Sequence, residues 1–346
     1  IDNHIPIDIS SYGSLAGNTI VKIGNGDQVS FAIDNMGNLH AWGINSHGEL
    51  GNDTTDNSWV PINISSYGSL SGRTIVSVSS GWQSHTMALD SLGHVHTWGY
   101  SYFGQLGNNT NSFSLVPIDI SAYGSLSGKN IVAITAGENH SIALDDSGIV
   151  HIWGGPGFKG VLGNNTTDDS LIPIDISLYG SLAGRTIIAI AAGWDFSMAL
   201  DTLGNVHMWG WNYAGQLGNN TTINSLVPIN ISSYGSLIGK TIISIMAGDS
   251  HGVALDSTGL VHVWGYNEDG ELGNNTTINS HIPILVEFDF AYAQKYGTLG
   301  IGTTTPRAAL DVVGDIITTT NIGIGTTSPR VALDVVGDII GSTNIG

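Results

Sequence analysis

Five histidines recur two residues before a Trp-Gly pair, and they are the first side chains to test for chemistry. They are His40, His96, His151, His207 and His262. Residues two apart on a strand share a face, so each imidazole is expected beside its Trp ring. A ring of imidazoles could bind a metal ion or titrate near neutral pH. Because every copy carries the same histidine, we interpret the position as one for packing or hydrogen bonding.

A second set of histidines occurs in only some of the copies. It consists of His85, His140 and His251, and Val29 and Phe196 take the same position in the other two copies. An apolar side chain cannot replace a catalytic imidazole. The replacements therefore indicate a packing position.

Loops rich in Gly, Asn and Thr offer the oxygen atoms that calcium prefers. They span residues 107–110, 163–167, 218–222 and 273–277. Carboxylates near such loops are few, namely Asp53, Asp168 and Asp169. Asn and Thr are also common turn formers. We therefore predict no cofactor and keep Ca²⁺ as the one candidate ion.

Another repeated position carries a carboxylate or an amide. Its residues are Asp2, Asp8, Asn63, Asp119, Asp175 and Asn230. A repeated position of this kind indicates a solvated turn, because a catalytic pair is expected to be unique. The chain also lacks G-x-S-x-G, P-loop and H-E-x-x-H motifs. We predict no catalytic, cofactor-binding or metal-ligating residues, and therefore not an enzyme.

Aromatic residues that break the repeat are the more interesting candidates. They are Trp59, Trp82, Tyr102, Phe103, Trp194, Trp211 and Tyr213. Aromatic side chains on loops could bind a glycan or a protein. Packing specific to one copy is the alternative interpretation.

Composition excludes some partners. Lys and Arg total 9 against 28 Asp and Glu, a formal net charge of −19. Nucleic-acid binding rests largely on Lys and Arg that neutralise phosphates, so DNA and RNA are not expected partners. No stretch approaches the roughly 20 apolar residues that a membrane-spanning helix needs. There are no cysteines, so disulfides and thiolate metal sites are excluded.

A repeat of about 55 residues positions all these side chains. Trp-Gly recurs at residues 42, 98, 153, 209 and 264. The copy that starts at Pro61 contains four short apolar segments, at 74–79, 85–90, 94–98 and 115–120, separated by turn residues. Four short strands per unit are typical of a β-propeller blade, whose faces must be covered by neighbouring blades. The sequence predicts an all-β propeller over residues 1–287 with five complete blades. Either further blades lie upstream of Ile1, which we favour, or the ring closes with fewer blades.

The units resemble regulator-of-chromosome-condensation repeats. The shared pattern is G-x-x-H-x-x-A-L-x-x-x-G-x-V-x-x-W-G, and residues 137–163 and 248–273 follow it closely. The resemblance implies a propeller, usually of seven blades. The best-known activity of the family is nucleotide exchange on a nuclear GTPase together with chromatin binding. We do not carry that activity over, because the matching residues form the scaffold and one fold hosts unrelated functions.

The end of the chain follows a different period. Residues 288–297 are interpreted as a connector, and residues 298–346 contain a 23-residue repeat, GIGTT followed by LDVVGDI, that is cut off in its third copy. This segment resembles stalk repeats of phage and bacterial fibres, which are typically homotrimers. A unit of 23 residues cannot bury its own core, so a β-rich, trimeric stalk is expected.

The combined pattern predicts a structural or binding subunit of an extracellular surface fibre or filament. The propeller would be a display or adhesion head, the stalk would provide self-association, and a cell-surface glycan or protein would be the partner. A phage tail fibre that binds a receptor is one alternative, and an enzyme or exchange factor that uses the propeller face is another. The expected location is the cell surface or the virion surface.

Overall fold

The computed structural model describes residues 7–82 and 85–286, together with four three-residue strands nearer the C-terminus. The chain divides by its contacts into two units, Ile1–Val286 and Glu287–Gly346. The predicted connector, 288–297, lies outside the described residues. No helix in the described part of the chain is long and apolar enough to cross a membrane.

Five four-stranded antiparallel sheets form the first unit and confirm the predicted blades. Blade 1 contains β1 (Ile20–Asn25), β2 (Val29–Asp34), β3 (Leu39–Gly43) and β4 (Ser58–Asn63). Blade 2 contains β5 (Ile75–Ser80), β6 (His85–Asp90), β7 (Val95–Gly99) and β8 (Ser114–Asp119). Blade 3 contains β9 (Ile131–Ala136), β10 (His140–Asp145), β11 (Val150–Gly154) and β12 (Ser170–Asp175). Blade 4 contains β13 (Ile187–Ala192), β14 (Phe196–Asp201), β15 (Val206–Gly210) and β16 (Ser225–Asn230), and blade 5 contains β17 (Ile242–Ala247), β18 (His251–Asp256), β19 (Val261–Gly265) and β20 (Ser280–Leu285).

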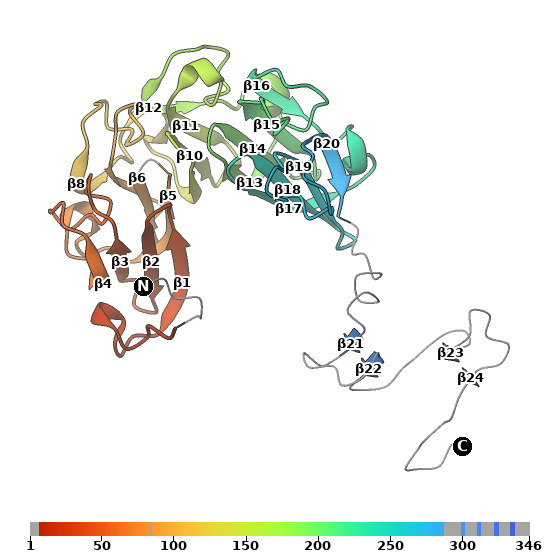
Figure 1. The fold of residues 1–346 in the computed structure, drawn as a ribbon. Coiled ribbons are helices and arrows are strands. Elements are labelled where there is room, and N and C mark those ends of the chain that lie inside the picture. Colours follow the sequence, from red (N-terminus) through yellow and green to blue (C-terminus); the bar gives the residue numbers. More distant parts are fainter. Residues whose placement is uncertain are drawn as a thin grey trace, which may run out of the picture. The chain divides into compact units, whose positions relative to one another are not determined.

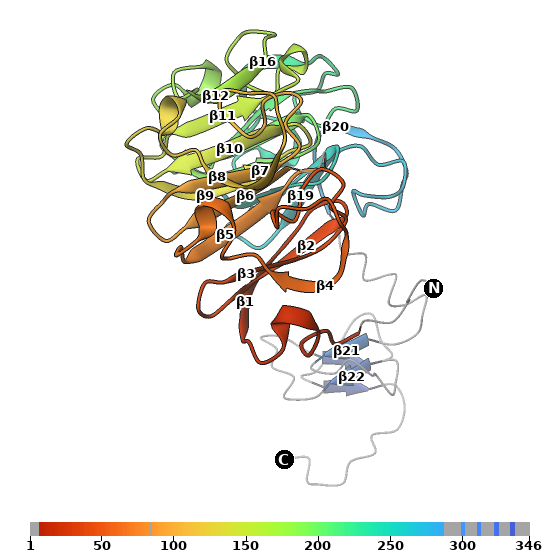
Figure 2. The ribbon, with the colours of Figure 1, turned by 90° about the vertical axis from the view of Figure 1, so that its left-hand side faces the viewer.

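The blades follow one another around an arc in chain order (Figures 1 and 2). Their first strands, β1, β5, β9, β13 and β17, contact one another in succession along the inner side of the arc. The loops between first and second strands lie at the same end of each blade as the loops between third and fourth strands, because the strands are antiparallel. We call this end the loop face. The opposite end, with the hairpins between second and third strands, is the turn face.

Short 3₁₀ helices connect the blades on the turn face. They are η1 (Gly13–Leu15), η2 (Gly68–Leu70), η3 (Gly124–Leu126), η5 (Gly180–Leu182) and η6 (Gly235–Leu237). The glycine that starts each one is required by a close approach. Gly68 has a φ of +49°, and a Cβ there would lie 2.2 Å from the carbonyl oxygen of Pro117. The sixth, η4 (Gly157–Lys159), lies instead in a loop of blade 3.

Buried tryptophans pack in the interfaces between blades. Trp98, Trp153, Trp209 and Trp264 are fully buried. Each indole N–H donates to a backbone carbonyl in the preceding blade, as from Trp209 Nε1 to Val161 O at 2.8 Å. Trp42 of blade 1, which has no preceding blade in the described residues, is only half-buried. The repeated Trp is therefore the residue that joins one blade to the next.

A glycine next to this Trp offers a test of the interface. Gly163 and Gly273 hold the same repeat position, with φ of +65° and +60°. A Cβ at Gly163 would lie 2.8 Å from the Trp209 ring, whereas a Cβ at Gly273 meets nothing within 4 Å. We expect Gly163→Ala to lower the free energy of unfolding by roughly 1–3 kcal/mol more than Gly273→Ala, because only the former overpacks the core. Equal urea midpoints for the two variants would contradict this account of the interface.

The second unit contains two parallel strand pairs in its described residues. β21 (Leu299–Ile301) pairs with β22 (Leu310–Val312), and β23 (Ile322–Ile324) pairs with β24 (Leu333–Val335). The rest of the predicted stalk lies outside the described residues. The trimeric stalk is not shown by this structure.

Candidate functional site

The histidines that precede Trp-Gly form a buried hydrogen-bonded set on the turn face. His40 Nδ1 lies 2.7 Å from Ser14 Oγ, and its Nε2 lies 3.2 Å from Asp34 Oδ2. Asp34 also accepts the backbone N–H groups of Met36 and Asn38 and so shapes the hairpin. The same Ser–His–Asp contacts recur in the other four blades, at His96, His151, His207 and His262.

This set has the residue types of a catalytic triad, but its hydrogen bonds hold the elements of each blade together. All five imidazoles are fully buried. Burial lowers the pKa of His151 and His207 despite the opposing effect of the neighbouring aspartate, so the neutral imidazole is favoured. Each histidine ties the 3₁₀ connector to the hairpin of its own blade. The predicted packing or hydrogen-bonding role is confirmed.

Two of the three histidines in the second set, His85 and His140, bridge neighbouring blades, whereas His251 of blade 5 is half-buried. His85 Nε2 lies 3.0 Å from Ser141 Oγ of blade 3, and His140 Nε2 lies 3.0 Å from Ser197 Oγ of blade 4. Both rings are fully buried, and burial lowers the pKa of each to about 3. Where Phe196 replaces the histidine in blade 4, the position that pairs with it in blade 5 is Gly252. The position serves packing between blades, as predicted.

In two of the four loops suggested for calcium, those at 218–222 and 273–277, a side-chain amide occupies the centre of the loop. In blade 4, Asn212 Nδ2 donates to Asn219 Oδ1, Thr221 O and Ile223 O, each at 3.0 Å. The oxygens of these two loops that would face a cation therefore already accept hydrogen bonds. No group of three or more His, Asp or Glu side chains suited to a metal ion occurs within the described ranges. The Ca²⁺ site remains an untested prediction.

The repeated Asp or Asn position forms a turn. Asp8 Oδ1 accepts the backbone N–H of Ser10 at 2.8 Å, and Asp175 Oδ1 accepts that of Ser177 at 2.8 Å. Asn63, Asp119 and Asn230 make the equivalent contact, and Asp2 lies outside the described residues. The predicted turn role is confirmed for these five residues.

The loop face carries a ring of equivalent positions whose chemistry differs from blade to blade. The position after the glycine between first and second strands holds Asp27, Trp82, Glu138, Trp194 and Asp249. We call these five residues the tip ring. The backbone connects three of them, because Glu138 N–H donates to Trp194 O at 3.0 Å and Trp194 N–H donates to Asp249 O at 2.9 Å. The scaffold thus places acidic and aromatic side chains around one axis.

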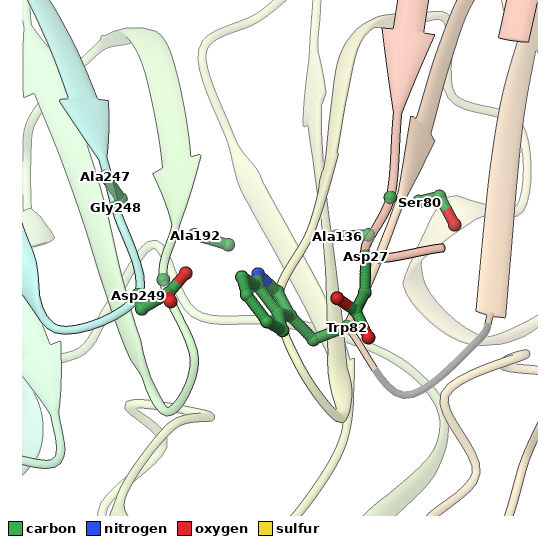
Figure 3. Close-up of a pocket in the computed structure, with 10 residues that line it drawn as sticks. Asp27, Ser80, Trp82, Ala136, Ala192, Ala247, Gly248 and Asp249 are labelled. Carbon is green, nitrogen blue, oxygen red and sulfur yellow. The ribbon is translucent and has the colours of Figure 1, made fainter. Parts of the chain in front are cut away.

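Three residues of the tip ring, Asp27, Trp82 and Asp249, line a cavity on the loop face, which we call the axial mouth. Its volume is about 320 Å³. All five blades contribute to its wall, blade 1 through its loop and the other four through the ends of β5, β9, β13 and β17. Figure 3 shows the Trp82 indole reaching from its own loop across the cavity towards Asp249. A second cavity of about 450 Å³ adjoins it over blade 5 and is lined by Trp194, Asp249, His251, Tyr266 and Glu271. Asp249 belongs to both cavities and separates them.

Aromatic side chains from distant parts of the sequence meet beside this mouth. The Trp82 and Trp194 rings lie 5.5 Å apart at 85°, an edge-to-face pair. Next to them, Lys159 Nζ lies 2.5 Å from Asp195 Oδ2 and 4.2 Å from the centre of the Trp211 ring. Burial raises the pKa of Asp195, while its ion pair with Lys159 opposes that effect.

The loop face is strongly negative. The segments 26–28, 44–57, 81–84, 100–113, 137–139, 155–169, 193–195, 211–224, 248–250 and 266–279 contain twelve Asp or Glu residues and one Lys. That Lys159 is already paired with Asp195. Burial raises the pKa of Asp249, and the charges of Asp27 and Glu271 add to the increase while His251 opposes it. A carboxylate held among like charges favours a cationic partner.

The structure brings together some of the aromatic residues selected from the sequence. Trp82, Trp194 and Trp211 lie on the loop face around the cavity mouth, whereas Trp59 is 81% exposed on β4. Tyr102 and Phe103 pack on each other at 5.0 Å. Sequence reasoning missed Asp27 and Asp249. An alignment of the five units at the glycine before each tip position would have shown the alternation of acid and aromatic.

Comparison with known proteins assigns the family. The model of the RCC1-like domain matches residues 2–306. The chain belongs to the RCC1-like domain family. A curated relative is the ultraviolet-B receptor UVR8 of Arabidopsis thaliana, 28% identical over 274 residues, which are 79% of this chain and 59% of UVR8.

Two solved structures share the fold of this RCC1-like domain. Human WBSCR16 has a TM-score of 0.68 at 22% identity, with 78% of this chain and 67% of that chain covered. Prp20p of Saccharomyces cerevisiae, a structure described with its binding to Gsp1p and histones, has a TM-score of 0.50 at 21% identity, with 78% and 77% covered. The fold is thus that of RCC1-like propellers.

These relatives correct two predictions. The fibre or filament subunit, cellular or phage, is wrong, because the RCC1-like relatives are regulatory and binding propellers. The extracellular or virion-surface location is wrong as well, because relatives such as UVR8 and Prp20p are intracellular regulators. RCC1-like propellers are mostly non-enzymatic, which supports the coarser expectation about catalysis. Both wrong predictions were based on the fibre-like repeat in the 49 C-terminal residues and not on the 287-residue propeller.

Proposed function

We propose that this RCC1-like domain is a protein-binding module and that the loop face is its binding surface. The observation that carries the proposal is the tip ring, a set of equivalent loop-face positions around one axis where acidic and aromatic residues replace each other. The Ser–His–Asp residues that maintain the fold repeat in every blade, whereas residues that recognise a partner need not. Large aromatic side chains supply contact area at low entropic cost.

The partner class follows from the relatives and from the charge. Prp20p is described as binding Gsp1p and histones, both proteins. Twelve acidic residues against one Lys on the loop face disfavour a nucleic-acid backbone. The turn face carries the same buried Ser–His–Asp set in all five blades. A protein or peptide partner on the loop face fits these observations best.

Selection from a random peptide library tests the module and its surface. We expect enriched peptides to bind the wild-type chain and to lose about tenfold in affinity on Tyr213→Ala, a side chain that is 79% exposed on the loop face. Leu178→Ala is the matched control, because Leu178 is 83% exposed on a connector of the turn face. Isothermal titration calorimetry of each variant gives the affinities. No enrichment, or enrichment of peptides sensitive only to Leu178→Ala, would refute the proposed surface.

A further inference from the structure

We propose that the two adjoining cavities of the loop face bind a basic peptide segment, with a Lys or Arg side chain in the axial mouth between Asp27, Asp249 and Trp82. This inference rests on the proposed function and adds the chemical class of the ligand. The axial cavity, of about 320 Å³, is large enough for one such side chain. The neighbouring cavity over blade 5, of about 450 Å³, offers Glu271 for a second basic group.

The side chains that line the axial mouth favour the binding of a cation. Two carboxylates, Asp27 and Asp249, line it together with Trp82. A cation placed over an indole face is attracted by the ring quadrupole, and a nearby carboxylate adds a charge-assisted hydrogen bond. The same pairing already occurs within the chain, where Lys159 Nζ sits 4.2 Å from the Trp211 ring centre and forms an ion pair with Asp195. The loop face thus contains an internal example of the contact that we propose for a partner.

A second copy of this chain is a poor occupant. The loop face has one Lys, and that Lys159 is paired with Asp195 inside its own chain. Two such faces brought together would place like charges opposite each other, which is unfavourable. A basic segment of a different protein supplies the complementary charge and is expected to associate faster at low salt.

Fluorescence anisotropy with a labelled peptide of alternating Lys and Ser tests the inference. The matched peptide carries acetyl-lysine at each Lys position, which removes the charge and keeps the length. We expect the Lys peptide to bind at least tenfold more tightly than the acetylated one. We also expect Asp27→Asn with Asp249→Asn to lower the affinity for the Lys peptide at least tenfold, and Trp82→Leu to lower it about fivefold.

A charge-matched double variant distinguishes the cavity from the general negative field. Asp56→Asn with Asp168→Asn removes two exposed carboxylates of the same face that line neither cavity. We expect this pair to lower the affinity by less than about threefold, and equal losses in both double variants would overturn the inference. Circular dichroism melting curves verify that each variant is folded. If selected peptides bind the loop face but carry no basic residues, this inference fails and the proposed function stands.

Discussion

Replacing Trp209 by Ala is expected to lower the free energy of unfolding by about 3–5 kcal/mol, among the largest losses available to a single substitution in this chain. Trp209 is fully buried in the core between blades 3 and 4, among Leu144, Ile152 and Leu162. Its removal leaves a cavity and takes the indole donor from Val161 O. Urea unfolding followed by far-UV circular dichroism measures the loss without relying on tryptophan emission.

Trp42 is the matched control, because it holds the same repeat position and no preceding blade occurs among the described residues. Trp42 is half-buried and belongs to none of the described core clusters. Trp42→Ala is therefore expected to cost less than about 2 kcal/mol. A loss as large as that of Trp209→Ala would show that the tryptophan stabilises its own blade, not the contact with the blade before it.

The strands could be predicted from the sequence because each has a local cause. In blade 2 the expected segments at 74–79, 85–90, 94–98 and 115–120 differ from β5 to β8 by one residue or none at each boundary. β-branched and apolar residues define these strands, and Asp90 with Gly93 defines the hairpin between β6 and β7. The repeat makes the strand boundaries easier to predict, since five copies of the unit support the same boundaries.

The binding surface could be predicted only in part, because it depends on where loops from distant blades meet. Trp82 and Trp194 are 112 positions apart in sequence and 5.5 Å apart in space. Their selection as residues that break the repeat was possible, but their contact was not. Asp27 and Asp249 resembled ordinary loop carboxylates until the fold placed them in one cavity wall. Lys159 became informative only through its contacts with Asp195 and Trp211.

Acid is expected to destabilise the propeller through its two fully buried inter-blade histidines. The pKa of His85 and of His140 is about 3 in the folded chain, against 6.5 for an ordinary imidazole. Between these values the unfolded chain binds more protons, so the stability that the neutral rings provide is complete above pH 6.5 and is lost as the pH falls towards 3. At pH 5 the free energy of unfolding is expected to be about 2 kcal/mol lower for each histidine than at pH 7. This difference is determined by the pKa of the histidine in the unfolded chain, because the folded pKa lies well below 5.

The chain supplies the variant that isolates this effect. Phe196 in blade 4 and Gly252 in blade 5 hold the repeat positions of His140 and Ser197, so His140→Phe with Ser197→Gly copies a pair that the scaffold already contains. The double variant is expected to lose about 2 kcal/mol less than the wild type between pH 7 and pH 5, measured as the difference in urea unfolding free energies at the two pH values. Other titrating groups, including the buried Ser–His–Asp sets, are the same in both chains and cancel. An unchanged pH dependence would mean that His140 is protonated in the folded chain at pH 5, which its burial and its contact with Ser197 oppose.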